Sequence, residues 1–272
     1  MLKTQAEKIT FSFGRNWQDF VERRLNPERE QIATDSLKEF MEVEDLRGRS
    51  FLDIGCGSGL FSLGAYRLGA RAITSIDVDP FSVRCCEELR RRAGEPPNWE
   101  IHEGSILDTA FLGSIPKADV VYAWGSLHHT GDMWQAIRNA ASMVEKNGLF
   151  YLSIYNKVPG RMGSELWLHV KRLYNRSPRS GKRLMEFAHF GRHVVRKLAS
   201  FENPRTLFTR YAADRGMDYW TDIRDWLGGY PYEFASTGEM FRFCTRELGF
   251  DLVNLHSTST LGTNEFLFRR RD

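Results

Sequence analysis

The sequence contains few cysteines, and they do not stand at the spacing of a metal site. The four in this chain of 272 residues are Cys56, Cys85, Cys86 and Cys244. They form neither a disulfide framework nor a zinc motif. No recognised ligand spacing relates the other candidate ligands, which are Asp218, Asp222, Asp225 and His256. We therefore predict no metal and a reducing, cytoplasmic setting.

The sequence also lacks a long apolar run. No run approaches the roughly 18 residues that a membrane-spanning helix needs, and residues 1–10 are polar, without the apolar centre of a signal peptide. Repeats and low-complexity tracts are absent as well. Because 42% of the residues are hydrophobic, the chain can bury a sizeable core. We expect a soluble protein with one large domain, or one domain with an insertion.

The most informative segment is residues 51–59, where an apolar strand runs into Asp53 and then into Gly55, Gly57 and Gly59. Glycines let the backbone turn sharply and approach a ligand closely. The spacing is not the dinucleotide G-x-G-x-x-G, and a loop built for pyrophosphate would not favour a carboxylate at Asp53. The ligand is therefore predicted to be partly cationic. S-adenosylmethionine fits, because Asp53 can hold its ammonium and a helix N-terminus its carboxylate.

A second acidic residue, Asp77, ends the next predicted strand about 20 residues past the glycines, where a carboxylate can accept both ribose hydroxyls. With residues 103–108 and 118–129 added, the chain resembles the class I S-adenosylmethionine-dependent methyltransferases. Residues 103–108 are similar to the adenine-contacting loop of that family, which implies cofactor contacts from Ser105 and Ile106. Residues 118–129 are similar to its fourth strand and the loop that follows.

The resemblance implies an α/β fold with a Rossmann-like, seven-stranded doubly wound sheet, an antiparallel C-terminal edge and a helical insertion. Helices are expected over residues 32–43, 60–68, 80–92, 132–144 and 236–248, and strands over residues 50–54, 72–77, 100–103, 119–124, 148–155, 250–256 and 264–269. We divide the chain into an N-terminal cap over the cofactor (1–30), a methyltransferase core (31–155 and 236–272) and a helical lid that contacts the substrate (156–235).

Residues 25–29 resemble the N-P-x-R element of the ubiquinone-biosynthesis O-methyltransferases, and this likeness covers about residues 25–155 and the last two strands. It implies that Arg29 reaches the methionine carboxylate through its guanidinium fork. Upstream, residues 11–17 resemble segments that fold over the cofactor in many relatives, so Phe13 or Trp17 could close the site. Alternatively, both aromatic residues pin a terminal helix to the core.

Methyl transfer from a sulfonium needs alignment and a water-poor cleft more than covalent machinery. If the acceptor is a hydroxyl, a base near neutrality helps, and His128 and His129 directly follow the fourth strand, with His128 slightly favoured as the base. The alternative is that one histidine orders the loop while the other packs inside. Trp124, on the same loop, is expected to shape the adenine or methyl pocket.

The predicted insertion is strongly basic. Residues 157–210 contain 13 Lys and Arg against 3 Glu, whereas the whole chain has a net charge of only +3. This asymmetry favours an anionic partner, which could be an acidic small molecule, an acidic carrier protein, a nucleic acid or a lipid surface. A solvated face on ordinary lid helices is the alternative. Two apolar helical faces are predicted, at Leu166, Val170, Leu173 and Tyr174 and at Leu184, Phe187, Ala188, Val194, Val195 and Leu198.

Residues 225–234, before the last predicted helix, resemble a segment that borders the acceptor pocket in some bacterial small-molecule methyltransferases. Tyr230, Tyr232 and Glu233 offer hydrogen-bonding groups beside aromatic surface, as an acceptor site would need. The glycines and proline of this segment are also explained by a turn alone.

These features predict a cytoplasmic S-adenosylmethionine-dependent methyltransferase that acts on a small or medium-sized acceptor, with O-methylation favoured over N-methylation. Whether the acceptor is anionic stays open, as does the oligomeric state. One alternative is a tRNA or other nucleic-acid methyltransferase, although no N-P-P-Y-type motif follows the fourth strand and no separate RNA-binding module is visible. The other is a cofactor-binding protein without catalysis, which intact Asp53 and Asp77 do not exclude.

Overall fold

The structure is a computed structural model that describes Gly14, Trp17, residues 26–201, Asn203 and residues 219–272. Most of the predicted N-terminal cap at residues 1–30, including Phe13, lies outside the described residues.

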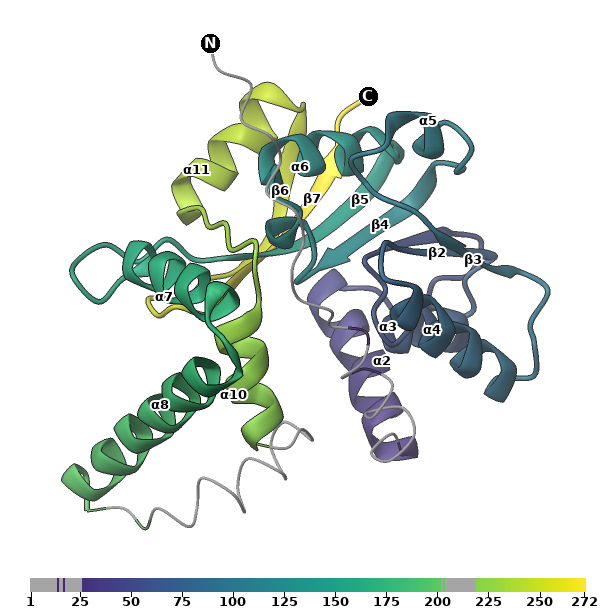
Figure 1. The fold of residues 1–272 in the computed structure, drawn as a ribbon. Coiled ribbons are helices and arrows are strands. Elements are labelled where there is room, and N and C mark those ends of the chain that lie inside the picture. Colours follow the sequence, from purple (N-terminus) through teal and green to yellow (C-terminus); the bar gives the residue numbers. More distant parts are fainter. Residues whose placement is uncertain (1–13, 15–16, 18–25, 202, 204–218) are drawn as a thin grey trace.

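The strands of the described chain form one seven-stranded sheet in the order β3-β2-β1-β4-β5-β7-β6 (Figure 1). Their bounds are β1 (Ser50–Ile54), β2 (Ala72–Asp77), β3 (Trp99–Glu103), β4 (Ala118–Trp124), β5 (Val144–Tyr155), β6 (Phe250–His256) and β7 (Thr263–Arg270). The first five strands pair in parallel, whereas β7 is antiparallel to both β5 and β6. The predicted Rossmann-like sheet with an antiparallel C-terminal edge is confirmed.

Helices cover both faces of the sheet, because successive residues of a strand point to opposite sides. On β1, Phe51 packs in the hydrophobic cluster shared with α2, α3 and α4, whereas Leu52 packs in the cluster shared with α5, α6 and α11. The bounds of these helices are α2 (Pro27–Met41), α3 (Leu60–Arg67), α4 (Pro80–Arg92), α5 (Thr109–Leu112), α6 (Met133–Ser142) and α11 (Thr237–Arg242). These two helix layers cover the faces of the sheet, so a ligand can reach the carboxyl ends of the parallel strands at the edge between them.

Local chemistry moves three helix boundaries from their predicted positions. The first helix starts at Pro27 and not at residue 32, because the Asn26 side chain accepts a hydrogen bond from the Arg29 amide and caps it. The helix predicted over residues 132–144 ends at Ser142, since Val144 already begins β5. After α11 the chain continues as a π-helical turn, η2 (Phe243–Glu247).

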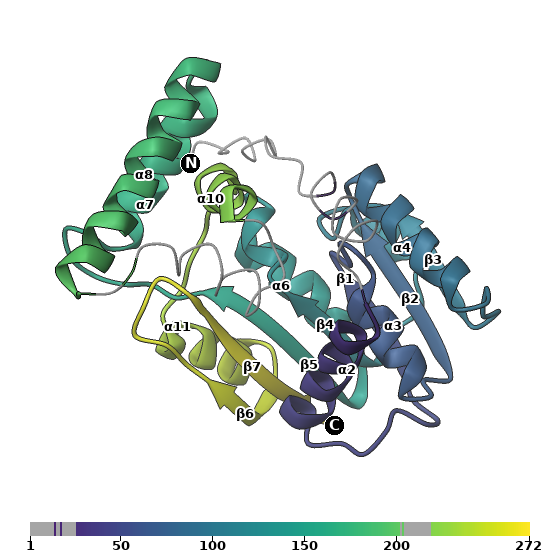
Figure 2. The same ribbon diagram turned by 90° about the horizontal axis from the view of Figure 1, so that it is seen from below.

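The insertion contributes the helices α7 (Ser164–Arg176), α8 (Arg179–Ala199) and α10 (Tyr219–Gly228). Figures 1 and 2 place these helices together, at the other end of the molecule from α4. Trp167 and Tyr174 of α7 pack against α10 in a small hydrophobic cluster of their own. The predicted apolar face of α7 was therefore partly wrong: Tyr174 is buried, but Leu173 is 60% exposed and Trp167 takes the inner position.

The predicted apolar face of α8 is mostly turned to the surface, at Leu184, Phe187, Val195 and Leu198. The helix itself continues through Gly191. Within residues 26–201 and 219–272, none of the helices combines the length and apolar character that crossing a bilayer requires.

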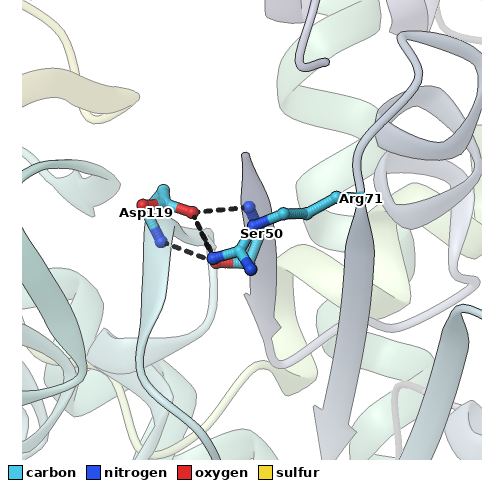
Figure 3. Close-up of polar contacts among 3 residues, drawn as sticks. All are labelled: Ser50, Arg71 and Asp119. Carbon is cyan, nitrogen blue, oxygen red and sulfur yellow. Dashed lines mark hydrogen bonds and ion pairs between the residues drawn. The ribbon is translucent and has the colours of Figure 1, made fainter. Parts of the chain in front are cut away.

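A polar cluster joins the amino ends of β1, β2 and β4, at the edge of the sheet opposite the open end (Figure 3). The Asp119 carboxylate accepts hydrogen bonds from the Ser50 amide and hydroxyl, both at 2.8 Å, and from Arg71 at 3.0 Å. Although partial burial acts to raise the pKa of Asp119, these hydrogen bonds outweigh it and lower that pKa.

Replacing Asp119 with Ala is expected to lower the free energy of unfolding by about 1 to 3 kcal/mol, because the Ser50 amide loses its acceptor. Water can reach this partly exposed site, which favours the lower end of that range. Urea unfolding measures the loss, and Asp119→Asn, which keeps one acceptor oxygen, should lose less. Cofactor affinity should not change in either variant. An Asp119→Ala protein as stable as the wild type would show that the cluster does not hold the strands together.

Candidate active site

A cavity of about 1140 Å³ lies at the carboxyl ends of the parallel strands. Its wall comes from the loops after β1, β2, β3 and β4 and from side chains of α7, α8 and α10. Doubly wound sheets bind ligands here, where the strand order reverses between β1 and β4. A pocket for one drug-sized ligand has a volume of roughly 300 to 1,000 Å³. The cavity is therefore large enough for a cofactor and a second molecule together.

The glycine loop after β1 turns sharply and lies close to its neighbours. Gly55 and Gly57 have φ values of 73° and 55°, a region that favours glycine. A Cβ on Gly55 would come within 2.3 Å of the Ser126 Cβ, and one on Gly57 within 2.9 Å of the Trp17 indole nitrogen. Glycine at these positions lets the loop lie directly against the loop after β4 and under Trp17, which also lines the cavity.

Two of the residues predicted to contact the cofactor are not among the described residues that line the cavity. Gly59 has a φ of 81°, and a Cβ there would meet the Cys86 sulfur at 2.6 Å, so this glycine allows α3 to pack against α4. Arg29 lies in the first turn of α2, and its side chain is not part of the cavity wall. Cofactor contacts from these two residues stay predictions.

Asp53 is a buried carboxylate at the end of a chain of hydrogen-bond donors. The Trp99 indole N–H donates to the Ser75 hydroxyl at 2.9 Å, Ser75 and Ser62 share a bond of 2.7 Å, and the Ser62 hydroxyl donates to Asp53 at 2.6 Å. Burial raises the pKa of Asp53 to about 7, partly offset by the Ser62 hydrogen bond and reinforced by the charge of Asp77. A cationic ligand in the cavity would therefore favour the ionised form.

Asp77 holds the glycine loop in place. One carboxylate oxygen accepts the Gly57 amide at 3.0 Å, and the other accepts the Asp79 amide at 2.8 Å. Burial raises the pKa of Asp77, and these amide hydrogen bonds offset part of the effect. Each carboxylate oxygen can accept a second hydrogen bond, so Asp77 can orient the loop and also accept two hydroxyls.

The predicted adenine side of the cavity is formed by the loops after β3 and β4. Ser105, Ile106 and Trp124 all line the cavity. The loop after β3 is fixed by the Asn139 side chain of α6, which donates to the Ile106 carbonyl at 2.8 Å. Trp124 is 41% exposed, so its indole is available to cover a ligand.

His128 and His129 lie on a short 3-10 helix, η1 (Leu127–His129), and both line the cavity. The His129 Nδ1 lies 2.6 Å from the Pro231 carbonyl. Because a carbonyl only accepts, Nδ1 carries the proton, and in the neutral ring the lone pair is on Nε2. Burial lowers the pKa of His129 to about 4, with a smaller lowering from the charge of Lys171 and an opposing effect of the Pro231 hydrogen bond.

His128 is the more enclosed of the two histidines. It is 1% exposed, and its ring centroid lies 4.1 Å from that of Tyr155 and 4.5 Å from that of His129. Burial, then the charge of His129, lowers the pKa of His128 well below its ordinary value, so both rings are neutral at pH 7. Among the described residues, its Nδ1 has no hydrogen-bond partner. That nitrogen is itself buried, whereas His129 is partly exposed, so His129 is the better placed of the two to present a basic nitrogen to the cavity.

Comparison with known proteins identifies the family to which the chain belongs. The profile described as "Methyltransferase domain" matches residues 17–218, well over half of the chain. The chain belongs to this methyltransferase family. Together with the strand order, this match confirms the class I S-adenosylmethionine-dependent methyltransferase predicted from the motifs.

Individual relatives of this methyltransferase are distant. The ubiquinone biosynthesis O-methyltransferase of Methylobacterium sp. (strain 4-46) is 30% identical over 142 residues, which are 50% of this chain and 55% of that protein. The chain thus spans about half the length of the curated relatives it matches.

Solved structures show the same fold at low identity. An O-methyltransferase family protein from Burkholderia thailandensis has a TM-score of 0.58 at 14% identity, over 100% of this chain and 64% of its own. The magnesium protoporphyrin IX methyltransferase of Synechocystis PCC 6803 with bound SAH has a TM-score of 0.55 at 13% identity, over 95% of both chains. At these identities the likeness shows the fold alone.

The three residues of this methyltransferase that were predicted to touch the acceptor are not among the described residues that line the cavity. Glu233 accepts hydrogen bonds from the amides of Gly131 and Met133 at the start of α6, and its own amide donates to the His128 carbonyl. Tyr232 packs its ring 4.9 Å from that of Tyr155. The Tyr230 hydroxyl accepts from Arg172 at 3.0 Å. These contacts fix the histidine loop and the insertion, so acceptor contacts from the three residues stay predictions.

The sequence analysis missed most of the residues with which the insertion lines the cavity, namely Trp167, His189, Arg192, His193 and Ile223. Asp225 and Trp226 also line it, and they belong to the segment that was predicted to border the acceptor pocket. The i, i+3 and i+4 spacing of His189, Arg192 and His193 was the available signal, but the apolar residues of α8 predicted that another face of this helix packs inward. No group of three or more His, Cys, Asp and Glu side chains in the described ranges is arranged to hold a metal ion.

Proposed function

We propose that this methyltransferase moves the methyl group of S-adenosylmethionine to a hydroxyl oxygen of a small or medium-sized acceptor that carries an acidic group. The observation that carries the proposal is one continuous cavity, lined both by the glycine loop with Asp53 and Asp77 and by the neutral histidine pair. Cofactor motif and candidate base thus share a space large enough for two molecules.

In this proposal Asp53 holds the cofactor's ammonium and Asp77 accepts the two ribose hydroxyls. Asp53 supports this role because it is 2% exposed, and no cationic side chain among the described residues pairs with it. Ser105 and Ile106 lie beside the adenine, and Trp17 and Trp124 cover the site. The cavity-lining positions of all four residues support these assignments.

The proposed reaction is a direct displacement. The acceptor oxygen forms a bond to the methyl carbon as the bond between carbon and sulfur breaks, and the electron pair of that bond stays on sulfur. The hydroxyl proton passes to His129 Nε2, the nitrogen left basic by the Pro231 hydrogen bond. Because the sulfonium charge disappears as the methyl moves, a site with little water favours the step. The rings of Tyr155 and Trp226 give this part of the cavity wall apolar surface.

The cofactor assignment predicts that Asp77→Ala weakens binding of S-adenosylhomocysteine by tenfold or more. Each hydrogen bond from a ribose hydroxyl to the carboxylate contributes about 1.5 to 3 kcal/mol, and about 1.4 kcal/mol corresponds to tenfold in affinity. The variant also frees the Gly57 amide, so Asp77→Asn, which retains one acceptor oxygen and the side-chain volume, should lose less. Isothermal titration measures both. Unchanged affinity in a folded Asp77→Ala protein would remove Asp77 from the site.

The methyl-transfer proposal is tested by incubating the protein with S-adenosylmethionine labelled in its methyl group and with a metabolite extract. Mass spectrometry of small molecules that gain the label is expected to reveal an acidic hydroxyl compound. Tight cofactor binding without transfer to any small molecule or RNA would instead identify a cofactor-binding protein. Label found in tRNA, and lost when Arg176, Arg179, Lys182 and Arg183 are neutralised together, would replace the proposed acceptor by a nucleic acid.

A further inference from the structure

The insertion gives the cavity a wall that is both aromatic and basic. Trp167 comes from α7, and His189, Arg192 and His193 from α8, while α10 contributes Trp226. The three α8 residues share one face of that helix, since they stand at positions i, i+3 and i+4.

Trp167 is the centre of this wall. The guanidinium carbon of Arg192 lies 5.4 Å from the centroid of its ring, the His189 ring lies 5.6 Å away, and the Trp226 ring 5.2 Å. His193 extends the row, with its ring 4.6 Å from that of His189. A guanidinium over an aromatic face is held in place while its N–H groups stay available to a ligand. Arg192 forms no ion pair with an acidic side chain of the described residues.

The position of Trp226 is fixed by α7. The buried Lys171 ammonium donates to the Trp226 carbonyl, and the Asn175 side chain donates to the Gly228 carbonyl at 2.9 Å. Both acceptors belong to the last turn of α10, whose carbonyls lack partners within the helix. Because α7 caps α10 in this way, the wall is preorganised.

Arg192 is the charged basic group of this wall, whereas the His189 ring beside it is neutral at pH 7. Burial, and then the charges of His193, Arg192 and Lys171, lower the pKa of His189 to about 4. Asp225 of α10 also lines this part of the cavity, and its charge acts in the opposite sense on Lys171. A negative group placed beside Arg192 would pair with its charge, and a neutral histidine ring next to it can still donate one hydrogen bond to that group.

We propose that Arg192, with His189 and His193 beside it, binds a carboxylate or phosphate group of a planar acceptor. The ring of that acceptor lies along Trp226 and Tyr155 and directs its hydroxyl toward His129. Tyr155 lies between the proposed anion site and the candidate base, since its ring centroid is 6.1 Å from that of Trp226 and 5.6 Å from that of His129. The identity of the bound anion as the methyl acceptor rests on the proposed function. The existence of an anion site rests only on the arrangement of Arg192 and its neighbours around Trp167.

The test measures ligand binding to protein saturated with S-adenosylhomocysteine, by titration calorimetry. The probes are 4-hydroxybenzoate, 4-hydroxyphenyl phosphate and the neutral 4-hydroxybenzamide, which share one ring and one hydroxyl. The variant is Arg192→Gln. Its control is Arg196→Gln, which removes an exposed arginine one turn further along α8 that does not line the cavity.

We expect the wild type to bind at least one acid about tenfold more tightly than the amide, as a charged hydrogen bond of roughly 1.5 kcal/mol requires. Arg192→Gln should abolish that preference and Arg196→Gln should keep it. The tighter of the two acids tells whether the site suits a carboxylate or a phosphate. Equal affinity for acid and amide, no measurable binding of either acid, or equal loss in both variants would overturn the proposal.

Assays of methyl transfer on the same probes separate this inference from the proposed function. Transfer to the amide as fast as to either acid, with no acid preference in binding, would contradict the anion site and leave methyl transfer standing. An acid preference that depends on Arg192, combined with no transfer to any hydroxyl compound, would support the anion site and contradict the proposed O-methylation.

Discussion

Replacing His129 with Asn is expected to lower the turnover number by about 10²- to 10⁴-fold, the usual loss on removing a general base. The Asn side-chain amide can still donate to the Pro231 carbonyl, as His129 Nδ1 does at 2.6 Å, so the loop should keep its shape. What disappears is the basic Nε2. Cofactor affinity, measured by titration calorimetry, should stay within about twofold, since general-base loss affects the chemical step.

The pH profile of turnover distinguishes a base from a structural histidine. Because burial lowers the pKa of His129 to about 4, the wild-type rate should already be flat above pH 6. It should not rise through 6.5, where an exposed imidazole titrates. His128→Asn is the companion variant, and a large loss there with wild-type turnover in His129→Asn would assign the base to His128. If both variants turn over at the wild-type rate, neither histidine is the base.

Cofactor affinity is expected to rise with pH, by up to tenfold per pH unit below about pH 7, and to be flat above it. In the free protein the pKa of Asp53 is raised to about 7, so at pH 5 this carboxyl is protonated. The proposed contact with the cofactor's ammonium favours the carboxylate, so binding must expel that proton below pH 7. The effect is large because a shift of one pKa unit equals about 1.36 kcal/mol.

Titration calorimetry in two buffers of different ionisation enthalpy measures the released proton directly. Asp53→Asn has the same size and no titrating group, so its affinity should be lower than that of the wild type at pH 8 and independent of pH. In the cofactor-free protein, the raised pKa of Asp53 has a second consequence: stability falls as pH rises from about 4 to 7, because only the folded state retains the proton there. A wild-type affinity that does not change between pH 5 and 7 would exclude Asp53 from the ammonium contact.

The fold could be predicted from the sequence because local patterns fix it. The strands at residues 50–54, 72–77 and 250–256 have the predicted bounds. The first two are buried parallel strands, which read as nearly continuous apolar runs that end at Gly55 and Asp77. Residues 250–256 form an antiparallel edge strand, in which more buried and more exposed residues alternate. The part of the cavity that the glycine loop lines could be predicted for the same reason. Asp53, Gly55 and Gly57 lie within a few residues of one another, so their spacing in sequence is also their spacing in space.

The exact helix boundaries depended on capping residues and strand partners, which the periodicity of apolar residues in the sequence does not reveal. The start of α2 moved to Pro27 through the Asn26 cap, and Val144 left its predicted helix because β4 offers it a strand partner at Ala118. Gly59 matched the cofactor motif, yet its packing distance to Cys86 was set by α4, more than 20 residues along the chain.

The sequence by itself determined the sheet, the glycine loop, Asp53, Asp77 and the position of the histidine pair after β4. Only the tertiary structure decided the wall that the insertion gives the cavity, because its side chains come from three helices, α7, α8 and α10, whose packing the sequence does not specify. Which face of α8 turns inward depends on where Trp167 and Trp226 lie, and their positions depend on Lys171 and Asn175 capping α10. The same contacts between distant segments made Nε2 the basic nitrogen of His129, since the Pro231 carbonyl that fixes its tautomer lies 102 residues further along the chain.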